Sequence, residues 1–167
     1  MTTLETMRIT SGGLTLGGPT CGSITVSGLE PAYMQDIGGM LTLLATRDDA
    51  RVNIVQMPST FRRLAIQADN GIGFDHGLNI LDAGILIEGD HDNSAADDVP
   101  NSIEFGGGSM MNVRDVLTLK SNTGTIIRNG DLTLRAGLGI ALYSHLNSTA
   151  VGSKLTFYSG RCRLLIL

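Results

Sequence analysis

The chain predicts an all-β fold, and within that class it favours a β-solenoid. Its strand motif Leu-Thr-Leu occurs four times, at residues 14–16, 41–43, 117–119 and 132–134. Each copy puts two large apolar side chains on one face of a strand and a small polar side chain on the other. Glycine, asparagine, aspartate and serine separate most of the apolar runs, as expected for short strands joined by turns.

The spacing of the apolar runs favours stacked coils. Three pairs of strand residues lie 23 positions apart: Leu41 and Leu64, Leu64 and Ile87, and Leu132 and Leu155. A solenoid coil takes about 20–30 residues and places equivalent faces on top of one another. Two shorter intervals, 15 residues from Leu117 to Leu132 and 14 from Ile126 to Ile140, are interpreted as steps from one face to the next. The alternative is a β-sandwich or jelly roll, in which a new strand begins about every 8–12 residues.

The individual elements follow from the apolar runs and from the turn residues between them. Asn70-Gly71 and Asn129-Gly130 are the strongest turn signals, because both residue types tolerate the positive φ of tight turns. The best helical stretch, residues 31–44, contains Gly38-Gly39, so little helix is expected. Strands are expected at residues 4–9, 13–17, 23–27, 40–45, 51–56, 62–68, 72–74, 78–80, 84–88, 102–105, 115–120, 125–128, 131–136, 139–143, 154–158 and 162–167.

The composition indicates a single folded domain spanning residues 1–167. Apolar residues make up 42% of the chain and charged residues 17%, which is too apolar for a disordered segment. The net charge of −4 argues against nucleic acid as a partner, because phosphate binding needs a basic face. There is no run of 18 apolar residues that could insert into a membrane as a helix. The absence of Trp counts against an immunoglobulin-type sandwich.

Two features bear on the cellular compartment. No signal peptide is visible, because the first residues lack the basic segment followed by an apolar segment that a secretory signal contains. Either the protein is not exported by that route or the sequence is a mature or excised piece. Cys21 and Cys162 lie 141 residues apart. Two free or buried thiols are favoured, and a disulfide joining the two ends of the chain is the alternative.

Residues 88–101 interrupt the strand rhythm. They contain five acidic residues and almost no apolar ones, which predicts a solvated acidic loop inserted in the domain. The sequence Gly-Gly-Gly-Ser at residues 106–109 predicts the most flexible tract of the chain.

Within that loop, Asp90, Asp92 and Ser94, with Asp98 beyond them, imitate the odd-numbered ligand spacing of a calcium-binding loop. Carboxylate oxygens are the hard ligands that Ca²⁺ prefers. Ala95 and Asn101, however, stand where an EF-hand requires Gly and a bidentate Glu. A plain acidic loop is therefore favoured over a calcium site, and no other cofactor is indicated.

The sequence predicts no catalytic site. A Gly-x-Ser-x-Gly motif is absent, and the three histidines are too far apart for a metal pair. The adjacent carboxylates Asp48-Asp49 and Asp97-Asp98 would point to opposite faces of a strand. We therefore expect a protein that is not an enzyme. A carbohydrate-active β-helix enzyme, with distant carboxylates converging in a groove, is a remaining alternative.

Residues 117–142, from Leu-Thr-Leu-Lys-Ser-Asn through Asn-Gly-Asp-Leu-Thr-Leu to Gly-Leu-Gly-Ile-Ala-Leu, carry a family resemblance. They resemble the repeats of filamentous-haemagglutinin-type β-helical adhesins, and residues 14–26 show the same pattern in weaker form. Together these segments cover about 40 residues. The resemblance implies a right-handed β-helix and an extracellular shaft used for adhesion or surface structure.

The C-terminus indicates self-association. The last four residues form an apolar end without a polar cap: Leu164, Leu165, Ile166 and Leu167. In water such an end would leave an association-prone strand edge. These residues either tuck into the core or pair with a neighbouring subunit. The favoured function is a structural subunit that self-associates into a filament, sheath or surface assembly outside the cell. The alternative is an adhesin or viral tail-fibre-like module that binds glycan or protein.

Overall fold

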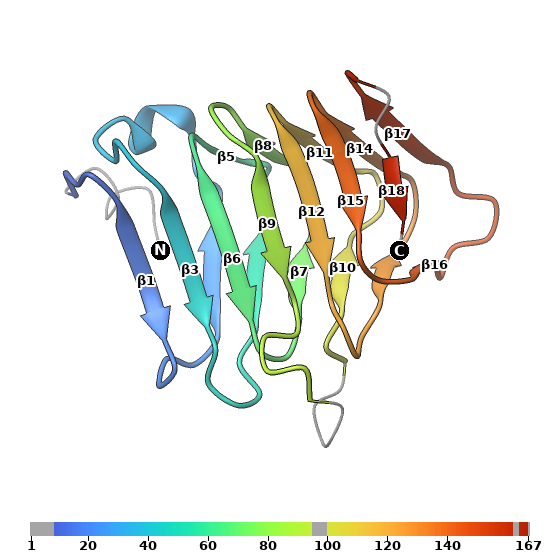
Figure 1. Ribbon diagram of the computed structural model, residues 1–167, viewed down its shortest axis with the longest axis horizontal. Coiled ribbons are helices and arrows are strands. Elements are labelled where there is room, and N and C mark those ends of the chain that lie inside the picture. The colour runs from blue at the N-terminus through green and yellow to red at the C-terminus, as the bar shows by residue number, and fades with distance from the viewer. Residues whose placement is uncertain (1–8, 95–99, 162–163, 167) are drawn as a thin grey trace.

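The chain folds into a β-solenoid made of three parallel sheets. The computed structural model describes residues 9–94, 100–161 and 164–166. All fifteen strand pairings between named strands are parallel, so the antiparallel sandwich is excluded and the solenoid is confirmed. Figure 1 shows the first sheet facing the viewer, with β1 at one end of the molecule and β18 at the other.

Each coil visits the first, second and third sheets in turn. The first sheet contains β1 (Leu14–Gly18), β3 (Leu41–Ala45), β6 (Leu64–Ala68), β9 (Ile85–Glu88), β12 (Val116–Lys120), β15 (Gly139–Leu142) and β18 (Leu164–Ile166). The second contains β2 (Ile24–Ser27), β4 (Val52–Val55), β7 (Ile72–Phe74), β10 (Ile103–Phe105), β13 (Ile126–Arg128) and β16 (Leu146–Ser148). The third contains β5 (Ser59–Phe61), β8 (Leu78–Ile80), β11 (Ser109–Val113), β14 (Leu132–Ala136) and β17 (Leu155–Ser159).

The first coil replaces its third-sheet strand by an irregular segment and one 3₁₀ turn, η1 (Pro31–Met34). The Thr60 N–H donates to the Leu29 carbonyl at 2.7 Å, which fixes this segment beside β5. Met34 and Ile37 are buried and extend the core below it. No helix among the described residues is long and apolar enough to cross a membrane.

The predicted 23-residue coil is correct for two of its three pairs. Leu41 faces Leu64 and Leu132 faces Leu155. Leu64, however, faces Ile85 and not Ile87, because this coil is two residues shorter. The intervals of 14 and 15 residues were wrongly interpreted as single steps between neighbouring faces. Each advances two sheets, from first to third or from second to first, instead of one.

Three strands were not predicted: β5, β11 and β16. They are short or polar, and β11 begins at the serine of the tract expected to be flexible. That tract is a packed corner instead. A Cβ at Gly106 would lie 2.7 Å from the Asp75 carbonyl oxygen, so the two coils touch through their backbones here. The strand expected at residues 4–9 lies almost wholly outside the described residues.

The core is a column of aliphatic side chains that runs from coil to coil. In the first sheet the buried residues of successive strands stand directly over one another, forming the row Leu43, Ile66, Ile87, Leu119 and Leu142. In the second sheet the rings of Phe74 and Phe105 stack with centroids 5.2 Å apart. Among the described residues, the partly buried apolar side chains packed on this core belong to the end coils: Leu14, Leu16, Ile24, Leu146, Leu155 and Phe157.

Candidate functional site

The C-terminal strand β18 exposes large aliphatic side chains at the end of the solenoid. It pairs with β15, with Leu164 opposite Ile140, Leu165 opposite Ala141 and Ile166 opposite Leu142. Ile140 and Leu142 are buried core residues, so Leu164 and Ile166 occupy core-facing positions of a coil that nothing described covers. Their exposed fractions are 45% and 60%, and that of Leu165 on the outer face is 46%.

These side chains therefore do not tuck into the core, which was one of the two expected arrangements. β18 is also the last strand of its sheet among the described residues, so its second edge has no strand partner there. Leu167, the fourth residue of the predicted self-association surface, lies outside the described residues.

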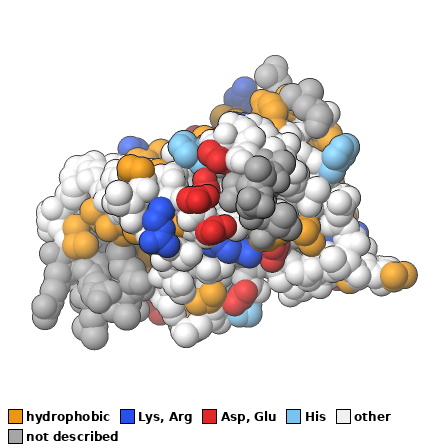
Figure 2. Space-filling view, turned by 90° about the horizontal axis from the view of Figure 1, so that it is seen from below, with side chains coloured by type: hydrophobic (Ala, Val, Ile, Leu, Met, Phe, Trp, Pro, Cys, Tyr) orange, Lys and Arg blue, Asp and Glu red, His pale blue; other side chains and the backbone are white. Residues whose placement is uncertain are grey.

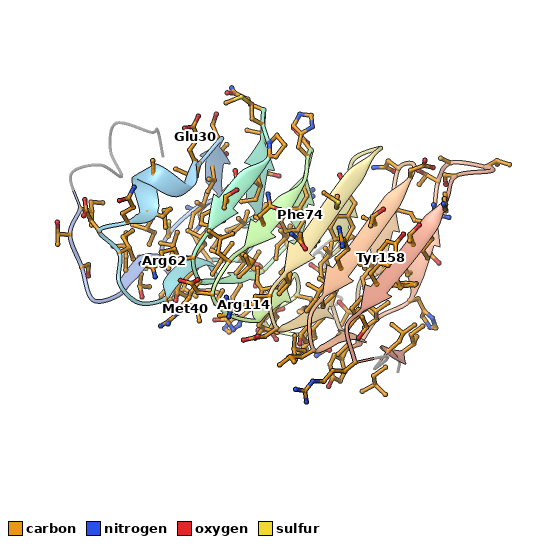
Figure 3. All side chains as sticks on the ribbon, turned by 90° about the horizontal axis from the view of Figure 1, so that it is seen from above. Glu30, Met40, Arg62, Phe74, Arg114 and Tyr158 are labelled. Carbon is orange, nitrogen blue, oxygen red and sulfur yellow. The ribbon has the colours of Figure 1, made fainter. Side chains whose placement is uncertain are left out.

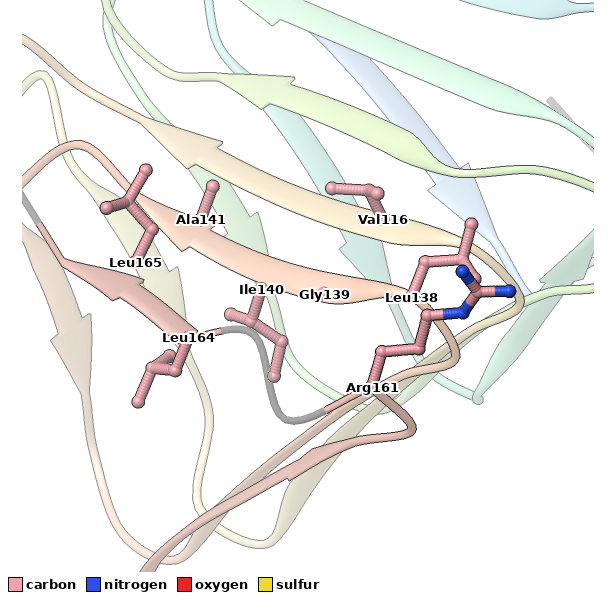
Figure 4. Close-up of a pocket in the computed structure, with 8 residues that line it drawn as sticks. All are labelled: Val116, Leu138, Gly139, Ile140, Ala141, Arg161, Leu164 and Leu165. Carbon is pink, nitrogen blue, oxygen red and sulfur yellow. The ribbon is translucent and has the colours of Figure 1, made fainter.

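An apolar hollow of about 730 Å³ adjoins β18 on the outer face of the first sheet. It lies beside Gly139, which has no side chain and pairs with Val116 of β12 (Figure 4). The exposed side chains of Val116 and Leu138 extend the apolar surface beyond it. The lining residues are Val116, Leu138, Gly139, Ile140, Ala141, Arg161, Leu164 and Leu165.

The opposite end of the solenoid offers a matching edge. β1 belongs to the same sheet as β18 and, among the described strands, pairs only with β3. Its core-facing residues Leu14 and Leu16 are only partly buried. Both ends of the first sheet thus carry a strand edge flanked by half-covered aliphatic side chains.

A row of polar and aromatic side chains crosses the outer face of the third sheet. Asn112, Arg135 and Tyr158 are direct neighbours on β11, β14 and β17. The Arg135 guanidinium lies 5.2 Å from the centre of the exposed Tyr158 ring, in a cation–π contact. Figure 3 shows Tyr158 toward the C-terminal end of the solenoid. These three residues line a shallow hollow of about 350 Å³ beside Gly137 and Gly160. The row was missed in the sequence, although its members recur at the 23-residue interval.

Glu88 anchors a polar corner at the end of β9. Its side chain is largely buried and accepts hydrogen bonds from Lys120 Nζ at 2.5 Å and from Gln67 Nε2 at 2.7 Å. His91 Nδ1 lies 3.6 Å from the same carboxylate. Burial alone would raise the pKa of Glu88, but the hydrogen bonds and positive charge of Lys120, with Gln67 and His91, outweigh it. The pKa is therefore held below its ordinary value of 4.5.

Replacing Lys120 by alanine is expected to destabilise this corner. The change leaves a buried Glu88 carboxylate without its cation, which should lower the free energy of unfolding by about 1–3 kcal/mol. Urea denaturation followed by circular dichroism at pH 7 measures the loss. Lys154→Ala removes a lysine whose side chain has no described ion pair, and it should be nearly neutral. Equal losses in the two variants would contradict the account.

The same carboxylate predicts an acid dependence of stability. Because the folded pKa of Glu88 is depressed, its stabilising contribution is complete above the unfolded pKa near 4.5 and is lost as the pH falls through the folded pKa. Glu88→Gln should therefore lower the free energy of unfolding at pH 7, and should lower it by a smaller amount below about pH 4. If Glu88→Gln lowered the free energy of unfolding by the same amount at every pH in this range, the corner would not stabilise the ionised form of Glu88.

The structure describes two of the three residues of the alternative calcium site, Asp90 and Asp92. Asp90 is buried at the corner, whereas Asp92 is exposed and its Oδ1 accepts a hydrogen bond from the Ser94 N–H at 2.8 Å. Asp98 lies outside the described residues. Within the described residues, no three His, Cys, Asp or Glu side chains gather in a way that could hold a metal. The loop's ends are also less solvated than expected, because Glu88, Asp90, Asn101 and Ser102 are buried.

The remaining prediction concerns the cysteines. Cys21 is partly buried and carries a free thiol, and Cys162 lies outside the described residues.

The chain was also compared with known proteins. No family model, no curated protein and no solved structure matches it.

Proposed function

We propose that the protein is a non-enzymatic structural subunit that self-associates end to end into a filament, sheath or surface assembly. The observation that carries the proposal is the strand β18, which presents Leu164, Leu165 and Ile166 half exposed on an edge that has no strand partner among the described residues. A strand edge of this kind is a template for pairing with another chain. An extracellular or surface location fits this role.

The two ends suggest how copies would join. β18 and β1 are the outer strands of one parallel sheet, so β1 of a second copy can continue the sheet beyond β18. Such a contact joins different surfaces of the two copies. Head-to-tail contacts of this type produce open filaments when the rotation between copies does not close a ring.

The energetics require more than the three aliphatic side chains. Each has about half of its surface covered already, so complete burial contributes roughly 1 kcal/mol per side chain. Association costs at least about 4 kcal/mol in lost translational and rotational freedom. Backbone hydrogen bonds along the edge, the partly buried Leu155 and Phe157, and the hollow over Gly139 are the further sources of binding energy.

Size measurements of a charged variant test the proposal. Leu164→Lys combined with Ile166→Lys places two charges in the proposed joint and should reduce the protein to a single chain. The wild type should be larger and should grow with concentration in size-exclusion chromatography with light scattering. Leu86→Lys is the control, because it adds charge at an exposed residue of β9, in the middle of the first sheet and away from both of its end strands.

Two results would contradict self-association through this end. One is a wild type that remains a single chain at high concentration. The other is a double variant that keeps its strand signal in circular dichroism and has the same size as the wild type. Should the double variant unfold, Leu165→Lys on the outer face replaces it, and an unchanged size would count against the joint.

The second candidate function is a glycan-binding module, which the row Asn112, Arg135 and Tyr158 favours. Sugar rings stack on exposed aromatic faces, and planar amide and guanidinium groups hydrogen-bond to hydroxyl or carboxylate oxygens. Strands about 4.8 Å apart repeat such groups along a flat surface. The row would therefore take a linear glycan, including one with acidic sugars.

Glycan-array binding tests this candidate. The wild type should bind a defined set of glycans, and Tyr158→Ala should abolish that binding while leaving the fold intact. Tyr143→Ala, which removes an exposed tyrosine elsewhere, should bind as the wild type does. Absence of wild-type binding, or equal loss in both variants, would reject the third-sheet row as a glycan site.

A further inference from the structure

The corner where residues 88–94 leave the solenoid and residues 100–102 return to it concentrates negative charge. Figure 2 shows carboxylate side chains gathered on this face of the molecule. Hydrogen bonds connect the corner to the preceding coil. The Asn101 N–H donates to Asn70 Oδ1, and Asn70 Nδ2 donates to Asp49 Oδ1. Two described cations reach this corner, and each already has a carboxylate partner: Lys120 pairs with Glu88, and Arg51, beside Gly71 and Ser102, pairs with Glu104.

Asp90 is the carboxylate of this corner that lacks compensation. Its exposed fraction is 0%, and its Oδ2 accepts one hydrogen bond, from the Thr123 N–H at 2.6 Å. Its Oδ1 is buried without a hydrogen-bond partner among the described residues, and Asp90 takes part in no described ion pair. A buried carboxylate in this state is costly unless a positive charge approaches it.

Asn101 supplies a second oxygen in the same condition. Its exposed fraction is 2%, and its Nδ2 donates to the Ser94 carbonyl at 2.7 Å and to Thr123 Oγ1 at 2.9 Å. The Ser94 carbonyl can only accept, so it requires the N–H side of the amide, and Thr123 Oγ1, which donates its own proton to the same carbonyl, accepts from Nδ2. Its Oδ1 is then left buried without a described partner. Thr123 therefore connects two buried side chains, each with an unpartnered oxygen.

We propose that this corner binds a divalent cation, Ca²⁺, through Asp90 Oδ1 and Asn101 Oδ1. Carboxylate and amide oxygens are both hard ligands of the kind that Ca²⁺ takes in its flexible shell, in which waters complete the coordination. Mg²⁺ fits less well, because it demands a compact octahedron and gives up its waters reluctantly. The bound charge neutralises Asp90 and ties the two ends of the 88–101 loop to each other and to the next coil.

The proposed ligands differ from those suggested by the spacing of the acidic residues. Asp92 is not among the proposed ligands, because its side chain is exposed and its Oδ1 already accepts a hydrogen bond from the Ser94 N–H. Asn101, which departs from the EF-hand pattern, becomes a ligand instead. Site formation requires the folded corner, so Ca²⁺ should bind the folded chain and raise its melting temperature by mass action.

The experiment uses the full chain treated with a chelator and dialysed. Isothermal titration with CaCl₂ should show one site, and CaCl₂ should raise the melting temperature measured by circular dichroism more than MgCl₂ does. Asp90→Asn should weaken Ca²⁺ binding at least about tenfold, since even loss of an outer-shell partner typically costs that much. Asp92→Asn is the matched control and should bind Ca²⁺ as the wild type does.

Absence of Ca²⁺ binding by the wild type would overturn the proposal. So would an Asp90→Asn variant that keeps its Ca²⁺ affinity, or an Asp92→Asn variant that loses binding to the same degree. If Asp90→Asn does not fold, Asn101→Ala takes its place, with the same tenfold expectation and the same contradicting result. None of these positions contacts β18, so the outcome is independent of the self-association test.

Discussion

Replacement of Phe105 by alanine is expected to lower the free energy of unfolding by about 3–5 kcal/mol, the usual cost of removing a buried phenylalanine ring. Phe105 is fully buried in β10 and stacks on Phe74 of the neighbouring coil. In a solenoid each coil contacts only its neighbours, so a cavity between two coils weakens the connection between the two halves of the column. Chemical denaturation followed by circular dichroism measures the effect.

Met110→Ala is the control for this substitution. Met110 lies a few residues further along the chain but points outward from β11 and is exposed, so its loss should change stability by no more than about 0.5 kcal/mol. Similar losses in the two variants would mean that the Phe74–Phe105 stack is not part of the core.

Gly137→Ala is expected to cost about 3 kcal/mol, at the upper end of the overpacking range. A Cβ at Gly137 would lie 2.0 Å from the backbone carbonyl oxygen of Arg114 in the coil below. A backbone atom cannot rotate away as a side chain can, so the two coils must separate at this corner. The space around Gly12, by contrast, holds nothing within 4 Å of a Cβ.

Gly12→Ala is therefore the matched control, and it should leave stability almost unchanged. Thermal and urea unfolding of both variants provide the comparison. A Gly137→Ala protein as stable as the Gly12→Ala protein would show that the coils do not approach as closely as described.

The sequence favoured the observed architecture over the sandwich because similar apolar runs recur at the coil interval. It was not sufficient for the register. Ile85 and Ile87 lie on the same strand face, and a slip of two residues keeps every side chain on its proper side. Periodicity therefore could not decide which of them faces Leu64. The strands β5, β11 and β16 were missed because neighbouring coils stabilise them, while their own short or polar sequences do not favour strands.

The candidate sites were predictable to different degrees. The apolar run of β18 was visible in the sequence, but its exposure was not predicted, because burial in the core was an equal alternative there. The pairing of Asp90 and Asn101 through Thr123 could not be predicted, because Thr123 belongs to the next coil and the stacking had to be known first. The row Asn112, Arg135 and Tyr158 could have been found, because its members follow the coil interval already detected.

Electron microscopy of the concentrated wild-type protein, combined with fibre diffraction, tests end-to-end assembly most directly. If β1 of one copy continues the sheet beyond β18 of another, the particles should be unbranched filaments one solenoid wide. Their strands should then repeat about every 4.7–4.9 Å along the filament axis. Uniform particles of single-chain size at every concentration, with no such repeat, would contradict the account.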